Sequence, residues 1–186
     1  VIIDGNSTDR SLKIAENLAA SFPWIFVKRQ EQFSNSGGHT NFSLAVSEAY
    51  QYLQEVASNR EIKYTFVGKL DMDQTIPPNF FEYLIDRCME EPGLGVVSGQ
   101  PYSYHDSRSD KTTTLQHKIK ADKYPIDELP DKRLYLKEAL DDIGGFPVTI
   151  YSPDSVVLAK LRMKGWIIRS FPDVKIINLR IETGIE

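Results

Sequence analysis

The sequence predicts an α/β fold, in which helices pack on the faces of a layered sheet. Short apolar runs alternate, along the first half of the chain, with segments whose apolar residues recur at helical spacing. Prolines and glycines fall between these segments, where helices and strands end. Strands that alternate with helices build layered sheets, which bind ligands near the carboxyl ends of their strands.

Each expected element follows from a local signal. Apolar runs, most of them rich in β-branched or aromatic residues, predict strands at residues 1–3, 24–27, 64–67, 94–98, 166–169 and 174–177. Apolar residues at helical spacing predict a helix after Ser7, a candidate N-cap, and another after Pro77-Pro78. Further helices are predicted at 38–57, 137–142 and 153–164.

Composition limits the function classes. The chain has 186 residues, of which 41% are hydrophobic, enough for the core of a single domain over residues 1–186. Its 22 basic and 26 acidic residues give a net charge of −4, a poor match to a protein that coats nucleic acid. Cys88, the single cysteine, excludes an internal disulfide and a cysteine-based zinc site.

No apolar run approaches the length that crosses a bilayer, and no secretory leader is evident. The expected compartment is therefore the cytoplasm. The chain begins at Val1, inside a strand-like run, which predicts that N-terminal sequence is missing.

Residues 105–132 interrupt the pattern with polar sequence rich in Ser, Thr, Asp and Lys. We expect an irregular surface segment there. It is either a tolerated insertion or a lid or acceptor-binding loop, and its length in a compact domain favours the functional alternative.

Asp71 and Asp73 directly follow a predicted strand and are separated by one residue. Residues i and i+2 of an extended segment point to the same side. Two carboxylates placed in this way suit Mg²⁺ or Mn²⁺, which can bridge phosphate oxygens. A solvated turn that happens to contain two aspartates is the alternative.

Two more aspartates are candidates for chemistry. Asp4 ends a predicted strand, where its carboxylate can accept a hydrogen bond from a nucleobase or ribose. Asp154 follows Ser152-Pro153 at a predicted helix start. It either compensates the helix dipole or acts as a general base that takes a proton from a hydroxyl.

Taken together, the segments resemble the inverting glycosyltransferases of family 2, which have the GT-A fold. Residues 1–9 resemble the first nucleotide-binding segment, (V/I)DDGSTD, and residues 70–78 resemble the DxD metal motif with its trailing proline. Residues 137–146 end in Gly-Gly-Phe, and residues 154–165 resemble the Glu-Asp helix of the family.

This resemblance implies a three-layer α/β sandwich with a central, mostly parallel sheet. It implies transfer of a sugar from a nucleoside-diphosphate sugar to a hydroxyl of a saccharide or lipid-linked acceptor, with Asp154 as the base. The cofactor would be Mn²⁺ or Mg²⁺. Relatives that use lipid-linked or polysaccharide acceptors at the inner membrane face extend the expected location to that surface.

The resemblance also implies the ligand contacts. Asp4, Gly37 and Asp71 would bind the nucleotide sugar. Asp73, with Asp71 and Asn178, would bind the metal.

The chain departs from the family pattern at several of these positions. Gly5 stands in place of the second aspartate of the first segment, and Pro153 in place of the glutamate before the base. Asn178 stands where a histidine often completes the metal site. Ser43, or Asn41 in another register, stands at the usual asparagine of the second helix.

Two other functions stay open at this point. The departures are compatible with a degenerate GT-A-like domain that binds nucleotide sugar without turnover. Residues 71–75 also match the DxDx(T/V) motif of haloacid-dehalogenase phosphatases. In that case Asp71 would be the nucleophile and Asp73 the acid/base, with 141–142 as the late acidic pair.

Overall fold

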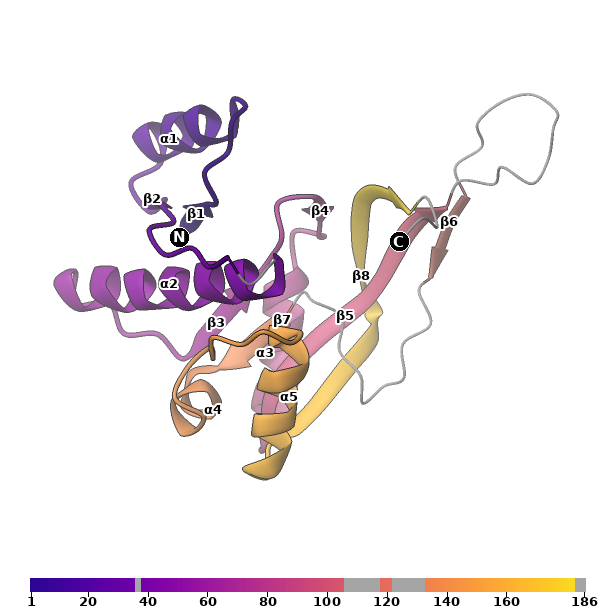
Figure 1. The fold of residues 1–186 in the computed structure, drawn as a ribbon. Coiled ribbons are helices and arrows are strands. Elements are labelled where there is room, and N and C mark those ends of the chain that lie inside the picture. Colours follow the sequence, from indigo (N-terminus) through magenta and orange to yellow (C-terminus); the bar gives the residue numbers. More distant parts are fainter. Residues whose placement is uncertain (36–37, 106–117, 122–132, 183–186) are drawn as a thin grey trace, which may run out of the picture. The chain divides into compact units, whose positions relative to one another are not determined.

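A computed structural model describes the protein at residues 1–35, 38–105, 118–121 and 133–182 (Figure 1). The chain forms two compact units. Unit 1 comprises Val1–Tyr64 and Leu140–Lys160, and unit 2 comprises Thr65–Ala139 and Leu161–Glu186.

Unit 1 contains a two-stranded parallel sheet, in which β1 (Ile2–Asp4) lies beside β2 (Val27–Arg29). Helix α1 (Ser11–Ser21) connects the two strands and contacts both, and α2 (Gly38–Asn59) contacts β1 (Figure 1). Parallel neighbours need such a crossover connection, because the chain must return to the starting end of the sheet. The predicted strand–helix order of this region is therefore present.

Helix α1 starts later than its predicted N-cap, Ser7. The Asp9 carboxylate accepts the backbone N–H of Ser11 at 2.8 Å, so Asp9 is the acidic side chain at the helix start. The N–H of Ser7 instead donates to Asp4 Oδ2 at 3.1 Å. The intervening residues form a turn with Asn6 at a φ of 64°, a left-handed conformation that asparagine tolerates.

Strand β2 is also displaced from its predicted position at 24–27. The N–H of Ile25 donates to the carbonyl of Phe22 at 3.0 Å, which forms a turn immediately after α1. Trp24 is consequently 69% exposed, and regular pairing begins only at Val27.

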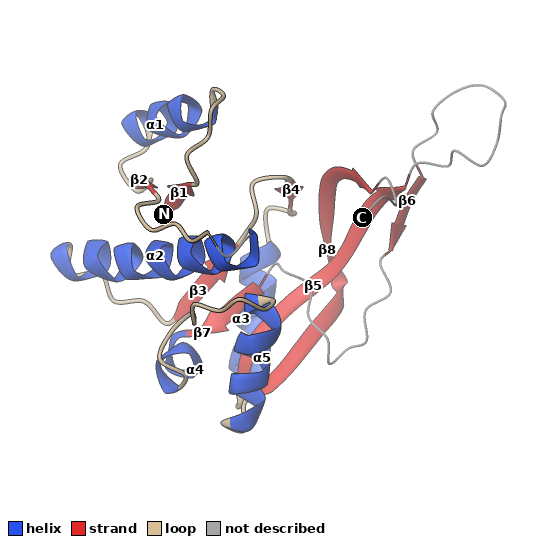
Figure 2. Cartoon of the chain, viewed as in Figure 1, coloured by secondary structure: helices blue, strands red, loops and turns tan. Residues whose placement is uncertain are grey.

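Unit 2 contains a six-stranded sheet with the order β3-β7-β5-β8-β4, and β6 pairs with the end of β5 (Figure 2). The strands are β3 (Phe66–Lys69), β4 (Gln74–Thr75), β5 (Leu94–His105), β6 (Lys118–Ala121), β7 (Arg133–Leu136) and β8 (Ile167–Glu182). Strand β6 lies within the segment predicted to be irregular. Residues 106–117 and 122–132 of that segment lie outside the described residues.

Strand direction is a correction to the expected sheet. The α/β class is confirmed, but the sheet of unit 2 is mixed rather than mostly parallel. Strand β5 runs parallel to β8, whereas β7 runs antiparallel to both β3 and β5, and β4 runs antiparallel to β8. Strands β3 and β5 do share a direction, as alternating strands and helices predict, but β7 inserts between them.

Helix α3 (Phe80–Glu90) contacts β5, β7 and β8 and supplies the core of unit 2. Phe80 and Leu84, four residues apart on one helix face, are fully buried. Val174 and Ile176, two residues apart on one face of β8, meet them. The cluster consists of Phe80, Leu84, Leu94, Val97, Leu134, Val174 and Ile176.

Strand β8 joins the two closing strands that were predicted at 166–169 and 174–177. Its pairing with β5 shifts register between Gly99 and Gln100, where Phe171 and Lys175 are their respective partners. Residues added to one strand of a pair bend the ladder without ending it. At the shift the backbones approach closely: a Cβ on Gly99 would lie 2.5 Å from the carbonyl oxygen of Val174 and 2.9 Å from the Phe80 ring.

Helices α4 and α5 span Lys137–Asp142 and Pro153–Met163. Each is followed by a glycine with positive φ, Gly144 at 78° and Gly165 at 87°. After α4 the N–H of Gly145 donates to the carbonyl of Leu140 at 2.8 Å, a Schellman-type ending that requires this left-handed residue. The predicted Gly-Gly turn is therefore a helix C-cap.

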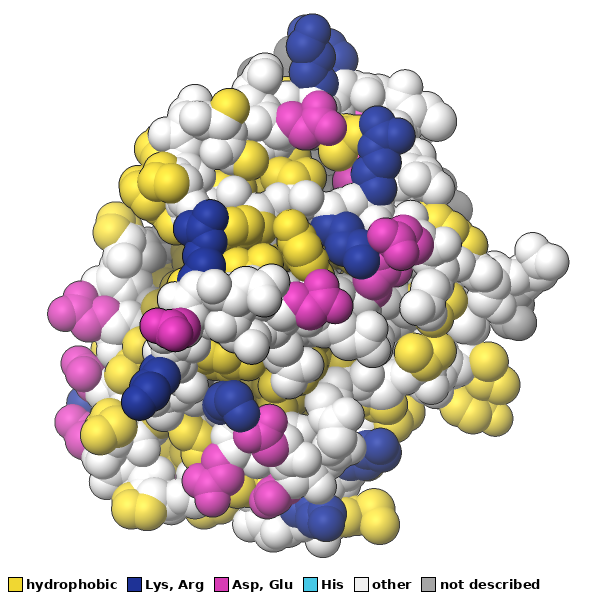
Figure 3. Space-filling view, turned by 90° about the vertical axis from the view of Figure 1, so that its left-hand side faces the viewer, with side chains coloured by type: hydrophobic (Ala, Val, Ile, Leu, Met, Phe, Trp, Pro, Cys, Tyr) yellow, Lys and Arg dark blue, Asp and Glu magenta, His cyan; other side chains and the backbone are white. Residues whose placement is uncertain are grey.

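The face drawn in Figure 3 mixes charges of both signs. On the face drawn in Figure 3, Lys and Arg side chains lie beside Asp and Glu side chains, with hydrophobic groups between them. None of the helices in the described part of the chain is long and apolar enough to cross a membrane.

We predict that Gly99→Ala destabilises the protein, because the added methyl group meets a backbone carbonyl that cannot move without breaking the β5–β8 pairing. The expected loss is about 1–3 kcal/mol in the free energy of unfolding, measured by urea denaturation. Gly38→Ala is the control, since its Cβ would have no neighbour within 4 Å. Equal stability of the two variants would contradict the close approach.

Candidate functional site

Two aspartates follow strand β3 in unit 2, where the chain turns into β4. Asp71 and Asp73 are half-buried, whereas Met72 between them is 77% exposed. Met72 and Asp73 form the turn that leads into β4, so the segment is not extended as the sequence predicted and the strand rule for a shared side does not apply to the pair.

Strand β4 connects this acidic pair to a distant part of the sequence. It pairs with β8, so that Gln74 lies opposite Asn178. The N–H of Leu179 donates to the backbone carbonyl of Asp73 at 2.7 Å. Asp73, which immediately precedes β4, therefore has its backbone beside Leu179, the neighbour of Asn178 on β8.

Gln74 has a specific relation to Asn178. Its Nε2 donates a hydrogen bond to Asn178 Oδ1 at 3.0 Å, which holds that amide in place. Its own Oε1 is buried and has no hydrogen-bond partner among the described residues. A buried acceptor without a partner costs about 1–3 kcal/mol, so a cation or donor group that met Oε1 would be stabilised here.

These groups fit a hard divalent cation. Two carboxylates and an amide oxygen are the kind of oxygen ligands that Mg²⁺ and Mn²⁺ prefer. Within the described residues, no three His, Cys, Asp or Glu side chains gather into a metal site. A bound ion would therefore complete its shell with water or with phosphate oxygens of a substrate, as Mg²⁺ commonly does.

Asp4 lies in unit 1 at the carboxyl end of β1 and is only 7% exposed. Strand pairing fixes its backbone, since its carbonyl accepts the N–H of Gln30 at 2.8 Å. One carboxylate oxygen, Oδ2, accepts the N–H of Ser7. Asp4 thus has a local role in the turn.

Asp154 lies in the first turn of α5, also in unit 1. The carbonyl of Ser152 accepts the N–H of Val156 at 3.2 Å, which starts the helix, and Pro153 occupies the first helical position. Asp154 therefore lies beside the free N–H groups of a helix start.

The Gly-Gly-Phe segment that precedes α5 packs on helix α2. Gly145 has a φ of 81°, and a Cβ at this position would lie 3.2 Å from the Tyr50 ring. Phe146 meets Tyr50 edge-on, with ring centroids 5.3 Å apart. Burial raises the pKa of the Tyr50 hydroxyl, so this packed ring stays uncharged. The glycine is required for space as well as for backbone conformation.

Ser43 holds the next part of the same segment. This fully buried side chain of α2 accepts the N–H of Thr149 at 3.1 Å. Its hydroxyl lies 3.1 Å from the carbonyl oxygen of Thr149 and 2.9 Å from that of Thr40, and donates to this pair of acceptors. The loop between Phe146 and Asp154 is therefore fixed to α2 at its centre.

One predicted residue lies outside the part of the chain that the structure describes, and two supporting residues were not predicted. Gly37 lies outside the described residues. Gln74 and Ser43 were not predicted as supporting residues. The family asparagine position, which Ser43 occupies, was a sequence signal that could have indicated Ser43. Nothing in the sequence indicates that Gln74 meets Asn178, because that pairing depends on the register of β4 on β8.

A profile of the family described as Glycosyl transferase family 2 matches residues 1–155. The chain belongs to glycosyl transferase family 2. The matched range includes β1, the acidic pair, the Gly-Gly-Phe segment and Asp154, but it ends before Asn178. The phosphatase alternative is set aside, because family membership accounts for segments to which it gave no role. A search of curated proteins found no significant match.

Solved structures share the GT-A fold of this family 2 chain. One is the mannosyltransferase PcManGT from Pyrobaculum calidifontis in complex with GDP-Man and Mn²⁺, with a TM-score of 0.61 and 18% identity over 98% of this chain and 48% of that chain. Another is GalNAc-T7 with UDP, GalNAc and Mn²⁺, with a TM-score of 0.58 and 10% identity over 99% of this chain and 38% of that one. The family 2 chain thus spans half or less of the length of these proteins.

We predict that Ser43→Ala releases the loop before Asp154, because both hydrogen bonds to Thr149 are lost. The amide of Thr149 should exchange its hydrogen faster, and the free energy of unfolding should fall by about 1–3 kcal/mol. Ser47→Ala, on the same helix and half-buried, is the control. Unchanged exchange at Thr149 would show that Ser43 does not hold the loop.

Proposed function

We propose that this family 2 protein transfers a sugar from a nucleoside-diphosphate sugar to a hydroxyl of a saccharide or lipid-linked acceptor, with inversion at the anomeric carbon. The observation that carries the proposal is the β4–β8 pairing, which brings Asn178 beside Asp73. This pairing brings together the backbones of segments far apart in sequence, whose side-chain oxygens would serve as ligands. The similar structures contain a nucleotide or nucleotide sugar with Mn²⁺, which supports the same donor class.

Asp73, Asp71 and Asn178 would hold the metal, either Mn²⁺ or Mg²⁺. A bound divalent cation neutralises the negative charge that develops on a departing diphosphate. Gln74 supports this set by fixing the Asn178 amide, and supporting contacts of this kind orient metal ligands.

Asp4, through its second carboxylate oxygen, would accept a hydrogen bond from the base or ribose of the nucleotide. Gly37 and Asp71 are the other proposed contacts to the donor. The position of Asp4 at the carboxyl end of β1 supports this role, because α/β sheets bind nucleotides at such ends.

Asp154 would act as the general base and take the proton of the acceptor hydroxyl as that oxygen attacks the anomeric carbon. Its place in the first turn of α5 supports this role, because the helix start fixes the backbone that carries the carboxylate. The Gly-Gly-Phe packing and the Ser43 contacts fix the backbone that leads to it. Both are needed because a general base must be held within hydrogen-bond reach of its substrate.

A domain that binds nucleotide sugar without turnover is the second candidate. It is favoured by the missing third acidic or histidine ligand among the described residues and by Pro153 at the glutamate position. This candidate retains donor binding but predicts no transfer to any acceptor.

We predict that Asp73→Ala abolishes the Mn²⁺-dependent part of nucleoside-diphosphate binding. Loss of a direct ligand should weaken binding at least tenfold, the lower end of what removal of a supporting contact costs. Calorimetric titration of UDP, GDP and dTDP with Mn²⁺, and then with a chelator, measures this. Asp86→Ala, an exposed aspartate of α3, is the control. Equal metal-dependent affinity in both variants would remove Asp73 from the metal site.

We predict that Asp154→Asn reduces transfer by a factor of about 10²–10⁴ and leaves donor affinity unchanged, because the amide keeps the shape but cannot accept the proton. Sugar transfer and donor titration on the same samples separate the two effects, with the exposed Asp142→Asn as the control. Full activity in Asp154→Asn would exclude it as the base. Absence of transfer by the unmodified protein with every acceptor, despite donor binding, would favour the non-catalytic candidate.

A further inference from the structure

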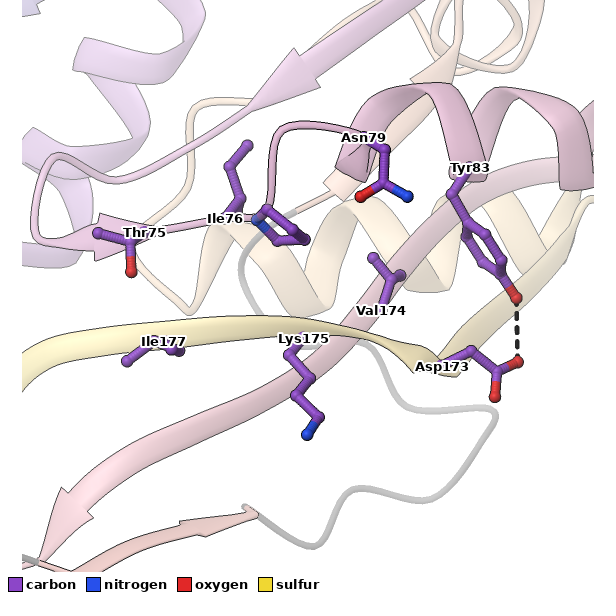
Figure 4. Close-up of a pocket in the computed structure, with 9 residues that line it drawn as sticks. Thr75, Ile76, Asn79, Tyr83, Asp173, Val174, Lys175 and Ile177 are labelled. Atoms are coloured by element: carbon purple, nitrogen blue, oxygen red, sulfur yellow. Dashed lines mark hydrogen bonds between the residues drawn. The ribbon is translucent and has the colours of Figure 1, made fainter.

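Unit 2 contains a pocket that the proposed reaction does not yet use. It has a volume of about 480 Å³ and lies between the start of α3, the β4 segment and β8 (Figure 4). Pockets that bind small ligands commonly have volumes of about 300–1,000 Å³. The lining residues are Thr75, Ile76, Pro77, Asn79, Tyr83, Asp173, Val174, Lys175 and Ile177.

The lining combines apolar surface with hydrogen-bonding groups. Ile76, Pro77, Val174 and Ile177 supply the apolar part. The polar groups are a hydroxyl, an amide, a phenol, a carboxylate and an ammonium, from Thr75, Asn79, Tyr83, Asp173 and Lys175. One acidic and one basic side chain leave the pocket with no net charge.

Three of the polar groups already have a contact before any ligand binds. The hydroxyl of Tyr83 donates to Asp173 Oδ2 at 3.0 Å (Figure 4), and the Tyr83 ring meets Phe171 edge-on. Partial burial and the Asp173 carboxylate raise the pKa of Tyr83, so the hydroxyl keeps its proton. The ammonium of Lys175 lies 5.2 Å from the centre of the Tyr102 ring.

The pocket shares its two strands with the proposed metal ligands. Thr75 ends β4, which Asp73 immediately precedes, and it pairs with Ile177, the neighbour of Asn178 on β8. Thr75 therefore lies within roughly 7 Å of Asp73, the reach of two extended residues. At about 3.3 Å per residue, Lys175 lies roughly 10 Å from Asn178 along β8. The pocket therefore begins about one sugar ring away from the residues proposed to hold the diphosphate.

We propose that this pocket binds a neutral pyranose ring of the acceptor saccharide. The assignment of this sugar to the acceptor rests on the proposed function, whereas the ligand class rests on the residues that line the pocket. A pyranose has a C–H face that suits the apolar residues and hydroxyls that suit the carboxylate, amide and phenol.

Other ligand classes match the lining less well. A phosphate would need an excess of positive charge or backbone donors, whereas the carboxylate of Asp173 offsets Lys175. A purely aliphatic ligand would remove the polar groups from water without replacing their hydrogen bonds. The donor sugar, bonded directly to the diphosphate, would lie closer to Asp73 than Lys175 does.

Saturation-transfer NMR with methyl glycosides of glucose, galactose, mannose and N-acetylglucosamine tests the ligand class. The assay contains neither metal nor nucleotide, so its outcome is independent of donor binding. At least one glycoside should show saturation transfer, and Asp173→Ala should weaken its binding by at least fivefold. Asp86→Ala, on the same helix as Tyr83 but outside the pocket, should bind like the unmodified protein.

A second variant, Asn79→Trp, fills the pocket from the start of α3 and should also abolish the signal. Melting temperatures of the variants identify any that fail to fold. No saturation transfer from any glycoside, or equal signals in the unmodified protein and both folded pocket variants, would overturn the proposal. Competition of the glycoside with a nucleotide sugar but not with the matching nucleoside diphosphate would assign the pocket to the donor sugar and overturn the acceptor assignment.

Discussion

The pairing of β5 with β8 is the interaction on which the rest of unit 2 depends. It runs from Leu94 and Ile167, through the close backbone approach at Gly99, to the outer ends of both strands. Its inward side chains meet Phe80 and Leu84 of α3, so the core forms only when the two strands are in register. The same strand β8 then presents Asn178 to β4. Packing and the proposed metal site are consequently linked through one strand.

The register shift at Gly99 joins these two functions of β8. Val174 of the core lies within the shift, and beyond it β8 carries Ile176 into the core as well as Lys175, Ile177 and Asn178. Extra residues in one strand re-aim the side chains that follow, a use of bulges that is common beside functional sites. The pocket and the oxygen ligands therefore share one rigid support, which favours precise placement of both donor and acceptor groups.

Unit 1 holds its candidate residues by a different principle. Asp4 depends on a short parallel strand pair, and Asp154 depends on a loop fixed to α2 by Ser43, Tyr50 and Phe146. One of these residues, Tyr50, belongs to none of the family segments. Substitutions there would act on the backbone that carries the reactive groups, because a misplaced general base loses efficiency even when its chemistry is unchanged.

The sequence by itself determined the α/β class, the family and the positions of the short motifs, because helical periodicity, glycine caps and acidic pairs are local signals. It also located α4 and the Gly-Gly turn after it, whose conformations arise from neighbouring residues. Only the tertiary structure decided that β7 runs antiparallel between β3 and β5, that Gln74 meets Asn178, and that Thr75 and Lys175 line one pocket. These outcomes depend on strand order and register, which are set by burial of side chains distant in sequence rather than by any local pattern.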